Sequence, residues 1–175
     1  MSDQYSTEER RDVSGFSALV FKGMGRVDLV QGDHEELIIE AQQEIRSRIR
    51  TTVSDNTLVI DYSEDWKDWT GFRTLSGDKI RFRLMMREVN ALSISGVGSL
   101  DCPRLETPNL ALAISGPGLL TLGTLKASKL DVALSGVGSV DVAGTVDELN
   151  LTLSGAGAFR AARLETTRAD VRLSG

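Results

Sequence analysis

Apolar residues occupy every second position in five segments of the chain, and small or polar residues lie between them. The apolar positions are Leu92 and Ile94; Leu110, Leu112 and Ile114; Leu130, Val132 and Leu134; Leu149, Leu151 and Leu153; and Val171 and Leu173. Alternation with a period of two is typical of a β-strand that buries one face. The pattern therefore predicts five strands that contribute to one hydrophobic core.

A Ser-Gly-x-Gly motif follows each segment, and its last copy stops after Ser-Gly. The motif serines are Ser95, Ser115, Ser135, Ser154 and Ser174, so they lie 20, 20, 19 and 20 residues apart. A second apolar pair follows each full motif, at Leu100 and Cys102, Leu120 and Leu122, Val140 and Val142, and Phe159 and Ala161. A fixed period near 20 residues indicates stacked units that share a core. We predict an all-β fold, a parallel β-helix of a single chain, with two strands and a glycine corner in each turn.

The same unit is visible once more near the start of the chain, at residues 15–29. Gly23 and Gly25 take the corner positions there, and Lys22 stands where the other units have serine. This copy predicts the first turn of the stack. The polar stretches between units predict short variable loops at 104–108, 126–129, 144–148 and 163–168, and the third of these is where the 19-residue unit differs in length.

The pattern also suggests a division of the chain. It predicts a flexible lead at residues 1–12 and one β-helix domain at residues 13–175. Within it, 13–90 would hold the first turn, capping strands and a tryptophan loop, and 91–175 the Ser-Gly-x-Gly turns. Strands are expected at 37–40, 58–60 and 80–86, with a hairpin turn at 54–57, whereas 41–48 fits either a helical turn or an extended segment. Because the chain stops within an unfinished turn, we expect a fragment of a longer protein or an end that another subunit covers.

Both tryptophans of the chain, Trp66 and Trp69, lie three residues apart, and Phe72 follows three residues later. This spacing places the three rings on one face of a helical turn. They could plug the capped end of the stack, or they could form an exposed patch that contacts a carbohydrate, a partner subunit or a membrane surface. The neighbouring acids weaken the membrane alternative.

Composition narrows the possible functions. The net charge of −5 argues against a nucleic acid or an anionic membrane as partner. With one cysteine, Cys102, and one histidine, His34, an internal disulfide, a zinc site and a catalytic triad are not expected; we predict no metal and no cofactor. The first residues do not resemble a signal peptide, and no apolar run approaches the roughly 18 residues of a membrane span. Taken literally, this places the chain in the cytoplasm.

Three kinds of function remain open. In a binding module, Ser95, Ser115, Ser135 and Ser154 would form an outer column of hydroxyls facing a glycan or a protein. In an enzyme of the polysaccharide-cleaving type, Asp101 and Asp141 would act together, but two strand spacings place them roughly 9–10 Å apart, at the outer limit for such a pair. We interpret them as solvated surface carboxylates and expect no catalysis. In a structural role, the stack would associate with itself through the unfinished turn.

Several of these segments together resemble a known bacterial family. They are the Gly15-Phe16-Ser17-Ala18-Leu19 opening, the Gly23-x-Gly25-x-Val27-x-Leu29-x-Gln31-Gly32-Asp33 stretch, Leu58-Val59-Ile60 and the Ser-Gly-x-Gly series. This combination resembles the auto-transporter adhesin, head GIN domain family. The resemblance implies a β-helix of the pectin-lyase-like type, usually right-handed, in an envelope or secreted protein that binds ligands or adheres. It implies no catalytic residues. On this basis Trp66, Trp69, Phe72 and the four serines are the candidate ligand-binding residues.

Overall fold

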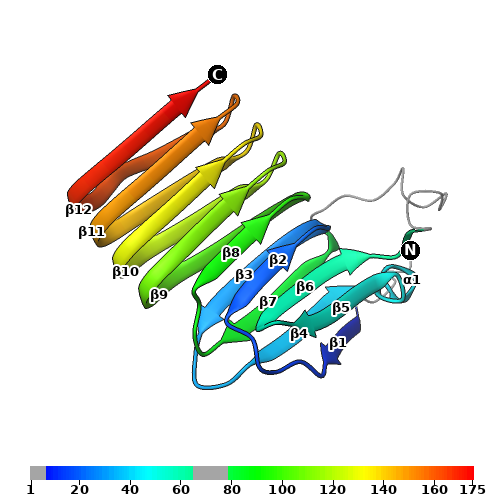
Figure 1. The fold of residues 1–175 in the computed structure, drawn as a ribbon. Helices are drawn as coiled ribbons and strands as arrows, with labels where there is room; N and C mark the ends of the chain where they lie inside the picture. The colour runs from blue at the N-terminus through cyan, green and yellow to red at the C-terminus, as the bar shows by residue number, and fades with distance from the viewer. Residues whose placement is uncertain (1–6, 65–78) are drawn as a thin grey trace.

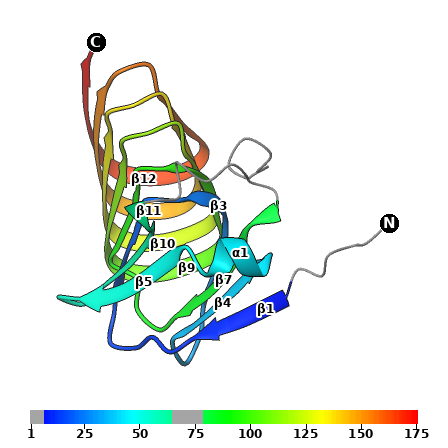
Figure 2. The ribbon, with the colours of Figure 1, turned by 90° about the vertical axis from the view of Figure 1, so that its right-hand side faces the viewer.

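The computed structural model describes residues 7–64 and 79–175, and within them the chain is built almost entirely of β-strands (Figure 1). The elements are β1 (Thr7–Arg11), β2 (Ala18–Phe21), β3 (Met24–Gln31), β4 (Glu36–Ala41), α1 (Gln43–Arg46), β5 (Ile49–Ser54), β6 (Thr57–Tyr62), β7 (Arg81–Met86), β8 (Ala91–Ile94), β9 (Val97–Ile114), β10 (Leu119–Leu134), β11 (Ser139–Ser154) and β12 (Ala158–Ser174). Figure 2 shows the turns of the coil lying one above the next. No helix in the described ranges is long and apolar enough to cross a membrane.

The stack of parallel strands confirms the predicted β-helix. Strands β9, β10, β11 and β12 pair in parallel, and the predicted inward positions lie directly opposite one another in the order Leu112, Val132, Leu151 and Val171. The first three of these side chains are buried. Removing such columns from water is the main stabilising contribution available to a fold that has few aromatic residues. The handedness of the coil stays a prediction.

The turns of β9, β10 and β11 each bury a third segment, and the sequence analysis assigned loops to this part of every turn. Strand β9 continues through 104–108, β10 through 126–129, β11 through 144–148 and β12 through 163–168, so the prediction of loops there is wrong. Leu105, Leu125 and Val146 point into the core and are almost fully buried. Their apolar side chains are separated by charged and polar residues, and that local pattern did not distinguish a bent strand from a loop.

The 19-residue unit is accommodated by a bulge in the strand pairing. Leu122 pairs with Val142, and the next aligned pair is Leu125 with Gly144, so β10 has one residue more than β11 at this point. The register between β11 and β12 shifts in the opposite sense between Asp141 and Ala143. Because both irregularities lie in the bend, the inward positions on either side stay aligned.

The turn at residues 15–29 lies inside the stack and does not form its end. Strand β2 pairs in parallel with β6 on one side and β8 on the other, and β3 lies between β7 and β9 in the same way. The chain therefore forms the second layer first, then the end layer, and then returns over the second. Leu19, Phe21 and Leu29 are fully buried, as the alignment with later units predicted. The repeat identifies which residues form a turn, but it carries no information about the order of the layers.

Antiparallel strands extend the sheet at the β6–β7 end. Strand β5 forms a hairpin with β6, and β4 pairs with β7 and with β1. The ambiguous segment 41–48 contains the short helix α1. The prediction of a flexible lead over residues 1–12 is wrong for Thr7–Arg11, which form β1. This strand contains no apolar residue, so it had no hydrophobic pattern by which it could be recognised.

The corner glycines are required because the backbones of adjacent turns approach too closely for a side chain. A Cβ atom on Gly96 would lie 2.0 Å from the Gly23 carbonyl oxygen, and one on Gly138 would lie 2.5 Å from the Gly118 carbonyl oxygen. Neither obstacle is a flexible side chain that could move aside. The Ser-Gly-x-Gly repeat is therefore a steric requirement of stacking at this spacing.

The Gln31 side chain, at the end of β3, forms hydrogen bonds with the backbone of β9 like those between paired strands. Its Nε2 donates to the Glu106 carbonyl oxygen at 2.9 Å and to the Arg87 carbonyl oxygen at 3.2 Å, and its Oε1 accepts from the Glu106 backbone nitrogen at 2.9 Å. The amide thus satisfies both backbone groups of Glu106 at the point where β3 ends and β9 continues.

We expect Gly96→Ala to lower the free energy of unfolding by at least about 2 kcal/mol, because the added methyl group collides with a backbone carbonyl. Urea denaturation followed by circular dichroism measures the loss. The matched control is Val97→Ala at the next position, where the side chain is 58% exposed and the change should stay within about 0.5 kcal/mol. Equal effects of the two substitutions would contradict the steric account of the corner.

We expect Gln31→Leu to lower the free energy of unfolding by about 1–2 kcal/mol, because it leaves two backbone groups of Glu106 without their partner. The size of the side chain is nearly preserved, so packing changes little. Gln43→Leu, at an exposed glutamine of α1, is the control and should have almost no effect in the same denaturation experiment. A neutral Gln31→Leu variant would show that the amide is dispensable.

Candidate binding surface

A shallow trough of about 680 Å³ runs along the outer face of the sheet formed by β6, β2, β8 and the C-terminal halves of β9 to β12. Figure 1 shows these strands side by side. The trough exists because alternation turns every second side chain outward, and most of the outward side chains are small. Its two rows, in strand order, are Thr57, Ala18, Ala91, Ala111, Asp131, Asn150 and Asp170, and then Val20, Ser93, Ala113, Ala133, Thr152 and Arg172.

The chemistry of the trough changes along its length. Over β2, β8 and β9 the outward side chains are alanine, valine and serine, and none of them is charged. Over β10 to β12 the outward side chains include charged groups, and these are paired. The Asn150 amide donates to Asp131 Oδ1 at 2.9 Å, and Arg172 Nη2 lies 2.9 Å from Asp170 Oδ2. One half of the trough is therefore uncharged, and the other half carries charged side chains that have polar or charged partners.

The motif serines form a column next to the trough. The backbone nitrogens of Ser95, Ser115 and Ser135 donate to the carbonyl oxygens of the turn before at 2.9–3.0 Å, and Ser154 pairs with Ser174. The structure thus aligns the four predicted serines, but none of them lines the trough. The small outward positions two and four residues before each serine do so. The signal that could have revealed them is the run of alanine and serine between the inward leucines.

Trp66, Trp69 and Phe72, the predicted aromatic contact residues, lie outside the described residues. Their role stays a prediction, as does the role of the serine column in binding.

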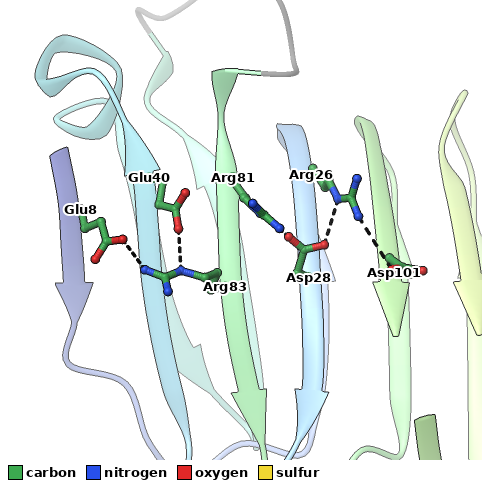
Figure 3. A network of polar contacts seen from close by, with 7 residues as sticks. All are labelled: Glu8, Arg26, Asp28, Glu40, Arg81, Arg83 and Asp101. Carbon is green, nitrogen blue, oxygen red and sulfur yellow. Dashed lines mark hydrogen bonds and ion pairs between the residues drawn. The ribbon is translucent and has the colours of Figure 1, made fainter. Parts of the chain in front are cut away.

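The carboxylates of the enzyme alternative lie on a different face of the coil, where Asp101 belongs to a charge network. Asp28 and Asp101 are directly opposite on β3 and β9, and Asp141 follows two strands further along, beyond Thr121. Arg26 pairs with Asp28 at 2.8 Å and with Asp101 at 3.8 Å, and Arg81 also pairs with Asp28 (Figure 3).

This network continues towards the edge of the sheet. Arg83 of β7 contacts both Glu40 of β4 and Glu8 of β1 (Figure 3). Arg83 lies between the two glutamates, and Arg26 and Arg81 flank Asp28, so each carboxylate of the network has an arginine as its partner. The network links β1, β4, β7, β3 and β9 across the outer face, which is a structural role for Asp28 and Asp101.

The pKa of Asp28 reflects that role. Partial burial raises its pKa, but hydrogen bonds from Arg81 and Arg26 and the charges of both guanidiniums outweigh burial and hold the pKa below its usual value. A carboxyl group held in this way is a poor proton donor near neutral pH. It stabilises the sheet as a carboxylate.

Cys102 and His34 differ in their environments. Cys102 is fully buried in the core and its thiol lies 3.4 Å from the Arg104 carbonyl oxygen. Burial raises the pKa of the thiol to about 11, so the thiol stays protonated and serves as a small core side chain. The His34 ring is about half exposed and lies beside the Asp33 carboxylate.

We expect Asp28→Asn to lower the free energy of unfolding by about 1 kcal/mol at pH 7, allowing for solvent screening of a partly exposed network. The carboxylate's contribution is fully present above the unfolded-state pKa of about 3.9. It is lost as the pH falls through the lowered folded-state pKa, so the two proteins should converge below about pH 4. Urea denaturation at a series of pH values measures this. Asp147→Asn, at an exposed residue of β11, is the control, and a difference between wild type and Asp28→Asn that does not depend on pH would contradict the assignment.

Known proteins share this architecture. The family model described as "putative auto-transporter adhesin, head GIN domain" matches residues 15–175. A structure described as a putative adhesin from Bacteroides fragilis is 25% identical, with a TM-score of 0.87 over 95% of this chain and 75% of that one. A putative lipid binding protein from Parabacteroides distasonis is 18% identical, with a TM-score of 0.70 over 95% and 78%. A putative adhesin from Parabacteroides merdae is 13% identical, with a TM-score of 0.67 over 97% and 78%.

No curated protein matches the sequence. The family match extends over nearly the whole chain and includes the Gly-Phe-Ser-Ala-Leu opening, the Gln-Gly-Asp turn and all the Ser-Gly-x-Gly turns from which the resemblance was inferred. The chain belongs to the putative auto-transporter adhesin, head GIN domain family.

Proposed function

We propose that this chain is a non-catalytic, adhesin-like binding module whose trough receives a protein partner. The observation that carries the proposal is the uncharged, small-residue half of the trough over β2, β8 and β9. Family membership and the similarity to structures described as adhesins support a binding role.

The trough has the properties of a surface that accepts another chain. Alanine and serine rows keep the sheet backbone close to the surface, so larger side chains of a partner can approach it without displacing anything. Contact with Ala18, Ala91 and Ala113 removes apolar surface of both molecules from water. The polar half, with Asp131 and Arg172, supplies hydrogen-bonding groups that can orient the partner.

A protein partner is favoured over a glycan by the lining of the trough. Sugar rings commonly pack against the faces of aromatic side chains, and none of the described residues that line the trough is aromatic. The serine column offers hydroxyl groups alone. Glycan binding would therefore depend on Trp66 and Trp69, which makes the two alternatives separable by mutation.

We expect Ala113→Arg to reduce partner binding at least tenfold, because a long charged side chain would fill the uncharged half of the trough. Ala113 is exposed and points outward, so the fold should tolerate the change. The readout is adhesion of beads coated with the protein to surfaces coated with fibronectin, fibrinogen or collagen, beside a glycan array. Thr121→Arg, on the outer face of β10 in the Asp101–Asp141 column and away from the trough, is the matched control and should bind as wild type.

Other results would reassign the site. Binding that survives Ala113→Arg but is lost in Trp66→Ala or Trp69→Ala would move it to the tryptophan segment. Signals on the glycan array alone would replace the protein partner by a glycan. A change in the mass of the chain in solution on Ala113→Arg would identify the partner as a second copy.

A further inference from the structure

Strand β1 is attached to the molecule in a different way from the strands of the stack. Its sequence is Thr-Glu-Glu-Arg-Arg, with no apolar side chain. It pairs antiparallel with β4, and Glu8 lies directly opposite Glu40. Its other edge has no strand neighbour among the described residues. What holds β1 is therefore backbone hydrogen bonding and charged side chains.

On the inner side of β1, charged side chains take the inward positions at which other strands have leucine or isoleucine. Glu9 lies beside Ile39 in the pairing and is shared by two arginines, with Arg11 Nε at 2.7 Å and Arg46 Nη1 at 3.2 Å. Arg46, at the end of α1, also donates to Thr7 Oγ1 at 2.8 Å, and Arg11 donates to the Arg46 carbonyl oxygen at 2.9 Å. The Arg46 side chain is only 12% exposed, so it forms the central contact of this inner cluster.

On the outer side, the remaining two residues of β1 also find opposite charges on other strands. Glu8 pairs with Arg83 of β7, and Arg10 pairs with Glu36 of β4 at 3.2 Å (Figure 3 shows the first pair). Thus Glu8 and Glu9 each meet an arginine of another element, Arg10 meets a glutamate, and Thr7 and Arg11 bond to Arg46. The site formed by β4, β7 and α1 is therefore complementary to an extended chain with the order acid–acid–base–base.

We propose that the β4 edge is a strand-acceptor site for this charge order, and that its partner is the β1 segment of a second copy of the chain. The argument for this partner is charge complementarity, because the chain itself carries the matching order, Glu-Glu-Arg-Arg, in β1. When β1 leaves, it gives up ion pairs and backbone hydrogen bonds but exposes no buried apolar side chain of its own. The same contacts form again when the β1 of another molecule binds.

The connection between β1 and the core permits this exchange. The first almost fully buried residue after β1 is Phe16, which is 3% exposed. Gly15 precedes it at a φ of +75°, and a Cβ atom there would meet nothing within 4 Å. The backbone between Arg11 and Phe16 can therefore change direction at Gly15, and the one apolar side chain between them that packs against the core is the partly buried Val13.

The test is a disulfide trap between molecules in a Cys102→Val background. One variant carries Glu8→Cys, another carries Glu40→Cys and a size tag, and the two are mixed over a range of concentrations under mild oxidation. A disulfide between them requires β1 of one molecule on β4 of the other. The control pairs the Glu8→Cys variant with a tagged Asp147→Cys variant, whose cysteine would lie at an exposed position of β11. We expect the Glu8–Glu40 heterodimer to form in at least fivefold higher yield than the control heterodimer. Its yield should rise with protein concentration.

Two further measurements complete the test. The double variant Glu8→Cys, Glu40→Cys must form the disulfide within one chain at high dilution, which checks that β1 occupies the β4 edge in the folded protein. A peptide that copies residues 4–13 should suppress the heterodimer, whereas a peptide in which the glutamates and arginines trade places should not. Heterodimer yields equal to the Asp147 control, or equal suppression by both peptides, would overturn the proposal.

Discussion

In-register stacking of parallel strands is the constraint on which the rest of this structure depends. Because side chains alternate between the two faces, a slip of one residue would move every inward leucine to the solvent side. The columns through Leu112, Val132 and Leu151 can exist only while the register holds. The register in turn requires that the corners stack without obstruction, and at Gly96 a single added carbon would lie 2.0 Å from the carbonyl oxygen of the layer beside it. Core and corner therefore depend on each other.

The same constraint shapes the outer surface. Once inward positions are large and aligned, outward positions are aligned as well, and their size decides whether the face is flat, ridged or hollow. Alanine and serine at the outward positions of β8 and β9 make it hollow. On the neighbouring face, alternating arginines and carboxylates cover the sheet and join β3 to β7 and β4. One backbone arrangement thus presents a face that is uncharged over β2, β8 and β9 and a neighbouring charged face, and the difference lies in the outward residues.

Much of the fold could be predicted because the repeat exposes the register directly. The strands, the corner glycines and the inward columns follow from alternation and from a period near 20 residues. The buried segment around Leu105 and Val146 could not be predicted, since polar neighbours hide its apolar side chains. Nor could the position of β2 and β3 inside the stack, because layer order is a property of the whole path of the chain. For the candidate site, the repeat predicted an aligned serine column. The trough beside it depends on the run of alanine and serine between the inward leucines, and small outward residues alone do not predict a hollow.

Two physically different attachments meet at the β4 end of the sheet. Strands of the stack are held by buried apolar columns, whose contribution salt does not screen. Strand β1 is held by ion pairs around Arg46 and Arg83, which salt screens, and by backbone hydrogen bonds that any extended chain can supply. Inward-pointing charges at a sheet edge also discourage indiscriminate pairing, because a foreign strand without the matching order would bury Arg46 unpaired. Arg46 and Arg83 thus disfavour the pairing of most strands with the β4 edge, and the same two arginines make that edge complementary to the sequence of β1.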